Sequence, residues 1–120
     1  MRIDSSGNLL VGKTSADNTT AGTTIYGSVG PGAASFVRDS GNTLILNRLT
    51  NDGEILAFRK DGTTVGSIGT ISGEFYIAHD STTDSGLRFR NGQIQPCNAS
   101  GGSNDAAVSL GQSSMRFSDL

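Results

Sequence analysis

Short apolar runs alternate with glycine-containing turns along the whole chain. The runs are four to seven residues long, and most follow an Asp-Gly, Asn-Gly or Ser-Gly step. Asp and Asn side chains bond to nearby backbone, and glycine accepts the positive φ that tight hairpin turns require. We therefore expect two clear hairpins. One turns at residues 51–53, between "TLILNRLT" and "EILAFRK", and the other at residues 90–92, between "LRF" and "QIQ".

The pattern within the runs predicts strands rather than helices. Phe75 and Ile77 alternate with Tyr76 and Ala78, and the runs are rich in β-branched and aromatic residues. No window keeps the i, i+3, i+4, i+7 stripe of an amphipathic helix. The turns recur roughly every 8 to 14 residues, a spacing typical of all-β proteins.

Several predicted strands are apolar on both faces. Leu56 and Phe58 would lie on one face of a strand, and Ile55 and Ala57 on the other. An antiparallel sheet with one face in water shows polar residues on that face. Two-sided strands therefore indicate a sheet packed between neighbours, and they suggest that copies of the chain pack on one another.

The chain reads as a single segment spanning residues 1–120. Small and polar residues dominate two stretches, near 16–34 and 96–105, and we expect each to form an exposed irregular loop or an irregular hairpin. The β-units vary in length, so the chain is not a solenoid of fixed period.

Composition indicates a thin core. The chain has 17 Gly and no Trp, and only 34% of its residues are hydrophobic. Glycine raises the conformational entropy lost on folding, and the single cysteine, Cys97, cannot form an intrachain disulfide. We expect Cys97 to be a small buried residue and the chain to share a core with identical copies.

From charge and hydropathy we expect that the chain neither binds nucleic acid nor inserts into a membrane. The net charge is -2, with no basic patch, and no apolar run approaches the roughly 20 residues of a membrane helix.

No group of residues suggests chemistry. The only histidine, His79, has no second histidine or nearby cysteine to share a metal. The acidic pairs Asp52/Glu54 and Asp80/Asp84 lie in glycine-rich turns, where their turn role already explains them. We therefore expect no enzyme activity, no catalytic or metal-binding residues and no cofactor.

Four blocks of the sequence resemble the tail-fibre and tail-spike proteins of tailed bacteriophages. They are "RIDSSGNLLVGKTS" (2–15), "FRKDGTTVGSIG" (58–69), "GLRFRNGQIQPCN" (86–98) and "VSLGQSSMRFSDL" (108–120). The last block is the most specific. The blocks are similar to the shaft region that lies just upstream of an intramolecular chaperone domain in such proteins. That chaperone domain would follow the last block, so no self-cleavage is assigned to any residue here.

The resemblance implies an elongated, intertwined homotrimeric β-fibre, of the triple β-helix or β-prism kind, in the tail fibre of a virion outside the cell. It would support host-receptor binding and contact neighbouring tail proteins. From the apolar pattern we expect these residues in the trimer core: Leu44, Leu46, Leu56, Phe58, Ile68, Phe75, Ile77, Phe89 and Ile94. Three C-terminal residues would close the lower end of the trimer: Met115, Phe117 and Leu120.

Other functions stay open. The chain could itself be a receptor-binding tip, with Tyr26, Tyr76 and the loops at 16–34 and 96–105 contacting host cell-surface glycan or protein. The low aromatic content, 6%, counts against a strong sugar site. A bacterial surface-adhesin stalk would share the same β-fibre physics, and a capsule depolymerase is the weakest reading because it needs paired carboxylates in a groove.

Overall fold

The protein is all-β. The computed structural model describes residues 1–27, 32–80, 85–111 and 113–115. These residues form nine strands in two antiparallel sheets, with no helix among them, so the predicted fold class is confirmed at this level. The chain divides into two compact units, Met1–Ile45 and Leu46–Leu120, and each is described by itself.

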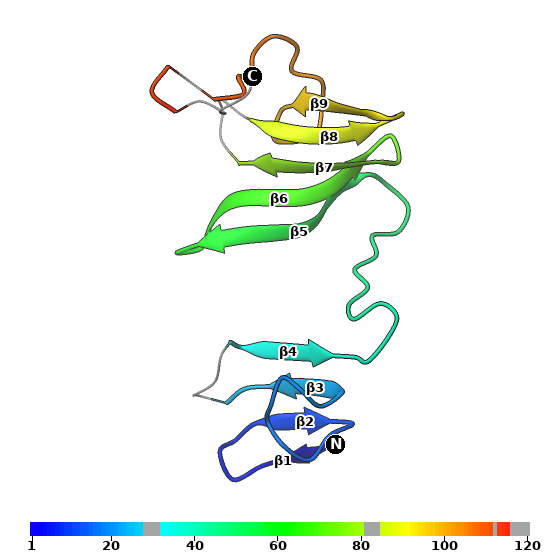
Figure 1. Ribbon diagram of the computed structural model, residues 1–120, viewed down its shortest axis with the longest axis vertical. Coiled ribbons are helices and arrows are strands. Elements are labelled where there is room, and N and C mark those ends of the chain that lie inside the picture. The colour runs from blue at the N-terminus through cyan, green and yellow to red at the C-terminus, as the bar shows by residue number, and fades with distance from the viewer. Residues whose placement is uncertain (28–31, 81–84, 112, 116–120) are drawn as a thin grey trace. The chain divides into compact units, whose positions relative to one another are not determined.

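The first unit is a four-stranded antiparallel sheet in which sequence neighbours pair, in the order β1-β2-β3-β4 (Figure 1). Its strands are β1 (Arg2–Ile3), β2 (Leu9–Val11), β3 (Gly22–Ile25) and β4 (Ala34–Val37). The turn between β1 and β2 is organised by Asp4, whose carboxylate accepts hydrogen bonds from the backbone N–H groups of Ser6 and Asn8, each at 2.9 Å. Asx turns of this kind are what the Asp-containing punctuation predicts.

The second unit is a five-stranded antiparallel meander in the order β5-β6-β7-β8-β9 (Figure 1). Its strands are β5 (Gly53–Lys60), β6 (Thr63–Ile71), β7 (Glu74–His79), β8 (Gly86–Arg90) and β9 (Gln93–Cys97). At the predicted hairpin turn between β8 and β9, Asn91 has φ 45° and Gly92 has φ 77°. Two successive positive φ values match the turn that continues the twist of paired strands, and this hairpin is confirmed.

The hairpin predicted at residues 51–53 is wrong. Residues 42–49 form no strand, and β5 pairs with β6 through a turn at residues 61–62 instead. The Arg48 guanidinium donates hydrogen bonds to the backbone carbonyls of Asn51 and Glu54, both at 3.1 Å. These bonds hold residues 48–54 in a wider loop than a two-residue hairpin turn, so the apolar run before them does not fold back onto β5.

The range 16–34, predicted as an exposed loop or an irregular hairpin, contains strand residues. Strand β3 lies inside that range, and β4 begins at its last residue. Threonine and isoleucine favour strands even where small polar residues surround them. In the range 96–105 the first two residues belong to β9, and the rest forms turns apart from an isolated bridge between Cys97 and Ser103.

Few apolar side chains are buried in either unit. The buried hydrophobic residues among those described are Leu10 in the first unit, and Tyr76, Ala78 and Cys97 in the second. The core of the second unit gathers on one face of the sheet, where Ile71 packs against it. The core is therefore as thin as the composition predicts.

Candidate assembly surfaces

One face of the second sheet is apolar, and the described residues leave much of it exposed. A row of directly paired residues crosses all five strands on this face: Leu56, Ile68, Ile77, Leu87 and Pro96. Directly paired residues of antiparallel strands project to the same side. A second row lies beside it on the same side, and in it the rings of Phe75 and Phe89 have centroids 5.6 Å apart. We call this surface the apolar face.

The apolar face is large for a single chain. Seven of its large side chains are 36–66% exposed: Leu56, Phe58, Phe75, Ile77, Leu87, Phe89 and Ile94. A large apolar side chain has on the order of 200 Å² to bury, so these seven leave roughly 600 Å² of apolar surface in one patch. That value lies at the top of the range for the largest patch of a monomer.

The opposite face of the same sheet is closed by the chain itself. Tyr76 is 1% exposed and Cys97 is fully buried there, and burial raises the pKa of the Cys97 thiol although the nearby Arg88 opposes this. Gly101 lies against the Tyr76 ring. The turns after β9 therefore cover this face, and among the described residues the apolar face is the more exposed of the two.

Charged groups also lie on the closed face. Arg88 is buried, and its Nη2 is 2.5 Å from Glu74 Oε2, while Arg90 Nε is 3.0 Å from Glu74 Oε1. Arg88 also donates from Nη1 to the carbonyl of Gly101 at 3.4 Å. One glutamate thus joins two strands and, through Arg88, the covering turn. The two faces of the sheet differ sharply in chemistry.

A groove of about 640 Å³ lies along the second sheet. Its apolar lining combines Phe58, Ile77 and Leu87 of the apolar face with Val108 and Leu110 from the C-terminal part. His79 and Ser85 also line it. The groove is mainly apolar, so it extends the apolar face rather than forming a polar site.

The first unit repeats this division of faces. Four side chains on one side of its sheet are exposed and apolar: Ile3, Val11, Ile25 and Phe36. On the other side Leu10 and Thr24 are paired and fully buried. Residues 12–21 form a loop on this buried side of the sheet, where Asn18 accepts a hydrogen bond from Ser35 of β4. In the described residues, each unit therefore covers one face of its sheet with its own chain and leaves apolar side chains exposed on the other.

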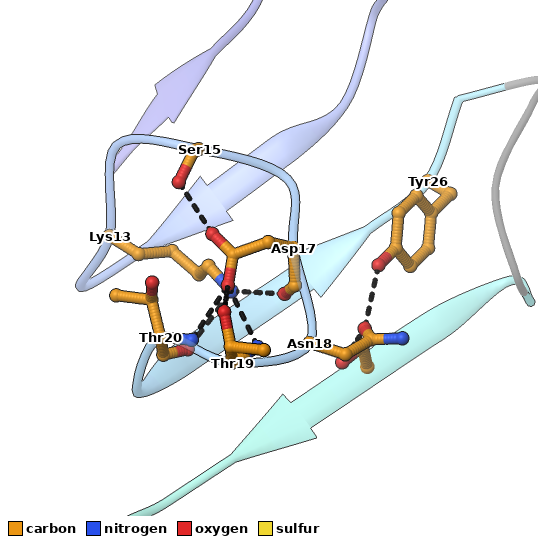
Figure 2. Close-up of polar contacts among 8 residues, drawn as sticks. Lys13, Ser15, Asp17, Asn18, Thr19, Thr20 and Tyr26 are labelled. Atoms are coloured by element: carbon orange, nitrogen blue, oxygen red, sulfur yellow. Dashed lines mark hydrogen bonds and ion pairs between the residues drawn. The ribbon is translucent and has the colours of Figure 1, made fainter.

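A buried lysine holds the covering loop of the first unit. The Lys13 side chain is 1% exposed, and its Nζ lies 3.6 Å from Asp17 Oδ1. The ammonium donates to the carbonyls of Asp17 and Thr20 at 2.5 and 3.0 Å. Figure 2 shows the ammonium lying among these groups. The Lys13 ammonium thus fixes the loop by bonding its backbone carbonyls. The sequence pattern does not predict this role.

Tyr26 and Tyr76, the two residues proposed for receptor contact, lie in different environments. The buried position of Tyr76 contradicts a role in contacting a receptor, because its ring is covered by Gly101. The Tyr26 hydroxyl donates to Asn18 Oδ1 at 3.0 Å (Figure 2). Ser35 Oγ donates to the same oxygen. Asn18 thus ties the loop both to Tyr26 and to β4.

The predicted core residues are brought together only in part. The structure places seven of them on the apolar face: Leu56, Phe58, Ile68, Phe75, Ile77, Phe89 and Ile94. Leu44 and Leu46 lie in the strandless segment before β5, and Met115 is exposed. Phe117 and Leu120 lie outside the described residues. Sequence reasoning missed Leu87, although the alternation in "GLRFR" could have found it, and missed the open face of the first unit.

Groups suited to catalysis do not converge in the described part of the chain. No cluster of three or more His, Cys, Asp or Glu residues there could hold a metal ion, and His79 is exposed at the end of β7. Asp52 has a turn role. Burial acts to raise its pKa, but hydrogen bonds from Gly73, Thr70 and Ser72 outweigh this and the pKa lies below its usual value. Asp84 of the second acidic pair lies outside the described residues.

Within the described ranges no helix is long and apolar enough to cross a membrane. Comparison with known proteins adds no relative: no family model, no curated protein and no solved structure matches this chain.

Proposed function

We propose that this chain is a structural segment of a phage tail fibre, in which three copies assemble into a shaft. The observation that carries the proposal is the apolar face, which the described part of the chain leaves largely open although it covers the opposite face of the same sheet. The four sequence blocks that resemble tail-fibre shafts supply the biological setting. The role is mechanical: the shaft holds a receptor-binding surface away from the virion and is fixed to neighbouring tail proteins.

The size of the apolar face supports burial against protein. A stable interface buries about 800 Å² per partner, and the exposed large side chains of the second unit alone supply roughly 600 Å². The open face of the first unit adds further apolar area. At about 25 cal/mol per Å², such surface is costly to leave in water, so a shared core stabilises the assembly.

Copies of the same chain suit this surface better than an unrelated partner. The seven exposed side chains of the apolar face carry no charge, so two such faces meet without a buried unpaired ion. A closed cyclic assembly also gives each copy the same environment. Three faces directed at one axis would form the core that the single chain lacks.

Light scattering of the purified protein at micromolar concentration tests the proposal. We expect the mass of a trimer. Ile77→Asp and Phe75→Asp place a charge on the apolar face and should dissociate it at least tenfold more readily. Thr63→Asp, at an exposed position beside the β5–β6 turn, is the matched control and should leave the mass unchanged.

Circular dichroism reports whether each variant still folds, since an unfolded variant says nothing about the interface. A stable, folded monomer of the unmodified chain at about 100 µM would overturn the proposal. That concentration is roughly a hundred times a Kd of 1 µM.

A further inference from the structure

The segment at residues 43–49 is apolar, exposed and unpaired. It reads "TLILNRL", and four of its side chains are large and exposed: Leu44, Ile45, Leu46 and Leu49, with Ile45 72% and Leu49 75% exposed. Its backbone from 43 to 48 makes no backbone hydrogen bond to any described residue. Four large aliphatic residues in so short a segment are a strong strand pattern, yet no strand forms.

Strand β5 has an unpaired edge. In the part of the chain that the structure describes, β5 pairs with β6 on one side and with no strand on the other. It is eight residues long. A long edge with an apolar face is a template for pairing with another chain, and β5 carries Leu56 and Phe58 of the apolar face.

The two unpaired elements are the halves of the hairpin that the sequence predicts. Within one chain the loop from Arg48 to Glu54 prevents that hairpin. The Arg48 guanidinium donates a hydrogen bond to the Glu54 carbonyl, and Thr50 has φ 79°. The strand pattern of both halves is nevertheless intact. A hairpin whose connecting loop is held open can be completed between chains, as in domain swapping.

We infer that residues 43–49 of one copy pair with the free edge of β5 in a neighbouring copy. The inference rests on the proposed trimer and names the contact that would link its subunits. Seven residues match an edge of eight, and pairing would satisfy backbone groups on both elements. It would also place alternate residues, Leu44 and Leu46, beside Leu56 or Phe58 and widen the apolar face.

Cyclic symmetry favours a copy of the chain as the partner. Each copy offers one donor segment and one acceptor edge, so the contact is heterologous. Three such contacts close a ring in which no segment and no β5 edge is left over. Any other partner would have to supply a matching strand for each.

Amide hydrogen exchange on the assembled protein tests the contact. We expect alternate amides between residues 44 and 48 to exchange at least about 100-fold more slowly than in an unstructured peptide. The protection should disappear in the Ile77→Asp variant, where the subunits separate. Neighbouring N–H groups of a strand point in opposite directions, so proline is placed at each of two adjacent sites.

Of the two variants Ile45→Pro and Leu46→Pro, the one whose N–H faces the partner strand should lose a pairing hydrogen bond. That variant should reduce protection across the segment at least about tenfold. Ser40→Pro, upstream of the segment and exposed, is the control and should leave protection unchanged. Both units should still fold, because no backbone hydrogen bond within the described chain depends on the amides of residues 45 and 46.

The outcomes separate this inference from the proposed function. A trimer whose residues 44–48 exchange like an unstructured peptide overturns the strand exchange and leaves the proposed function standing. Protection that persists in the Ile77→Asp monomer means pairing within one chain and overturns it too. Protection in a complex whose added mass belongs to a different protein also overturns it, and a monomeric unmodified chain overturns both.

Discussion

Gly101 lies against the ring of Tyr76, with no room for a side chain between them. A β-carbon at position 101 would fall inside van der Waals contact of Tyr76 Cδ1 and 2.9 Å from Cγ2 of Ile71. The backbone at Gly101 also has φ 78°. Glycine at this position therefore closes the turn over the core of the second unit.

Gly101→Ala should destabilise the second unit through both the clash and the positive φ. Gly73 isolates the second effect, since its φ is 74° and nothing lies within 4 Å of its β-carbon position. Gly73→Ala should cost about 1 kcal/mol, and Gly101→Ala about 1–3 kcal/mol more. Urea unfolding followed by circular dichroism, at one fixed chain concentration, measures both. Equal losses would mean that the covering turn does not pack as described.

Glu74→Gln should destabilise the second unit because it leaves Arg88 buried without a counter-charge. The Arg88 side chain is 9% exposed and 2.5 Å from Glu74. Breaking a buried pair by removing one partner is strongly destabilising, and we expect a loss of about 2–4 kcal/mol. The free energy of unfolding in urea is the measurement.

Arg90→Gln is the matched control for that pair. Arg90 contacts the same glutamate, but its side chain is 45% exposed, so the loss should stay below about 1 kcal/mol. If the two variants cost the same, the burial of Arg88 contributes nothing and the argument is wrong.

Lys13→Met should loosen the loop that covers the first unit. The change keeps the aliphatic stem but removes the donor to the carbonyls of Asp17 and Thr20. We expect a loss of about 2–3 kcal/mol, since hydrogen bonds from charged groups are the strong ones. Faster amide exchange at Thr24 and Leu10 would report it. Lys60→Met, at a side chain 79% exposed, is the control and should have no measurable effect on the same amides.

The alternation of apolar and polar residues predicts the strands better than it predicts which face of a sheet is buried. It identified the strands of the second unit, the hairpin at 90–92, and seven residues that share the apolar face. Alternation assigns residues to two faces but does not say which face is covered. The pattern therefore predicts a surface position for Tyr76, although a glycine turn more than twenty positions later buries it.

Two other features depend on single polar side chains, which apolar patterns do not register. Arg48 bonds across the loop at 48–54 and prevents the hairpin that "NDG" suggests. Lys13 is buried although lysine is among the residues least often buried. In both cases the hydrogen bonds run to backbone carbonyls, whose positions the sequence alone does not reveal.

Acid should destabilise the first unit by protonating its turn carboxylates. Hydrogen bonds from the Asn8 side chain and backbone hold the pKa of Asp4 below the usual 3.8, and those from Ser15, Thr19 and Thr20 lower the pKa of Asp17 further. Folded-state values below the unfolded ones give a contribution that is complete above about pH 4 and is lost as pH falls below it.

Exchange of the Leu10 and Thr24 amides between pH 5 and pH 2, corrected for intrinsic rates, measures this loss. Asp17→Asn should flatten the pH dependence, because the amide keeps an acceptor oxygen and does not titrate. Asp61→Asn, beside the exposed Lys60, should leave it unchanged. A profile that Asp17→Asn does not alter would contradict the assignment.

Thr24→Val should stabilise the first unit. Thr24 is fully buried in β3, and its Oγ1 has no hydrogen-bond partner among the described residues. A buried hydroxyl without a partner costs on the order of 1 kcal/mol or more, and valine has the same shape and the same preference for strands. We expect a gain of about 1 kcal/mol in the urea unfolding of this unit. Thr23→Val, at the neighbouring half-buried position, should change stability by less than about 0.5 kcal/mol. A loss of stability in Thr24→Val would show that the hydroxyl is bonded in solution, for example to a water molecule beneath the covering loop.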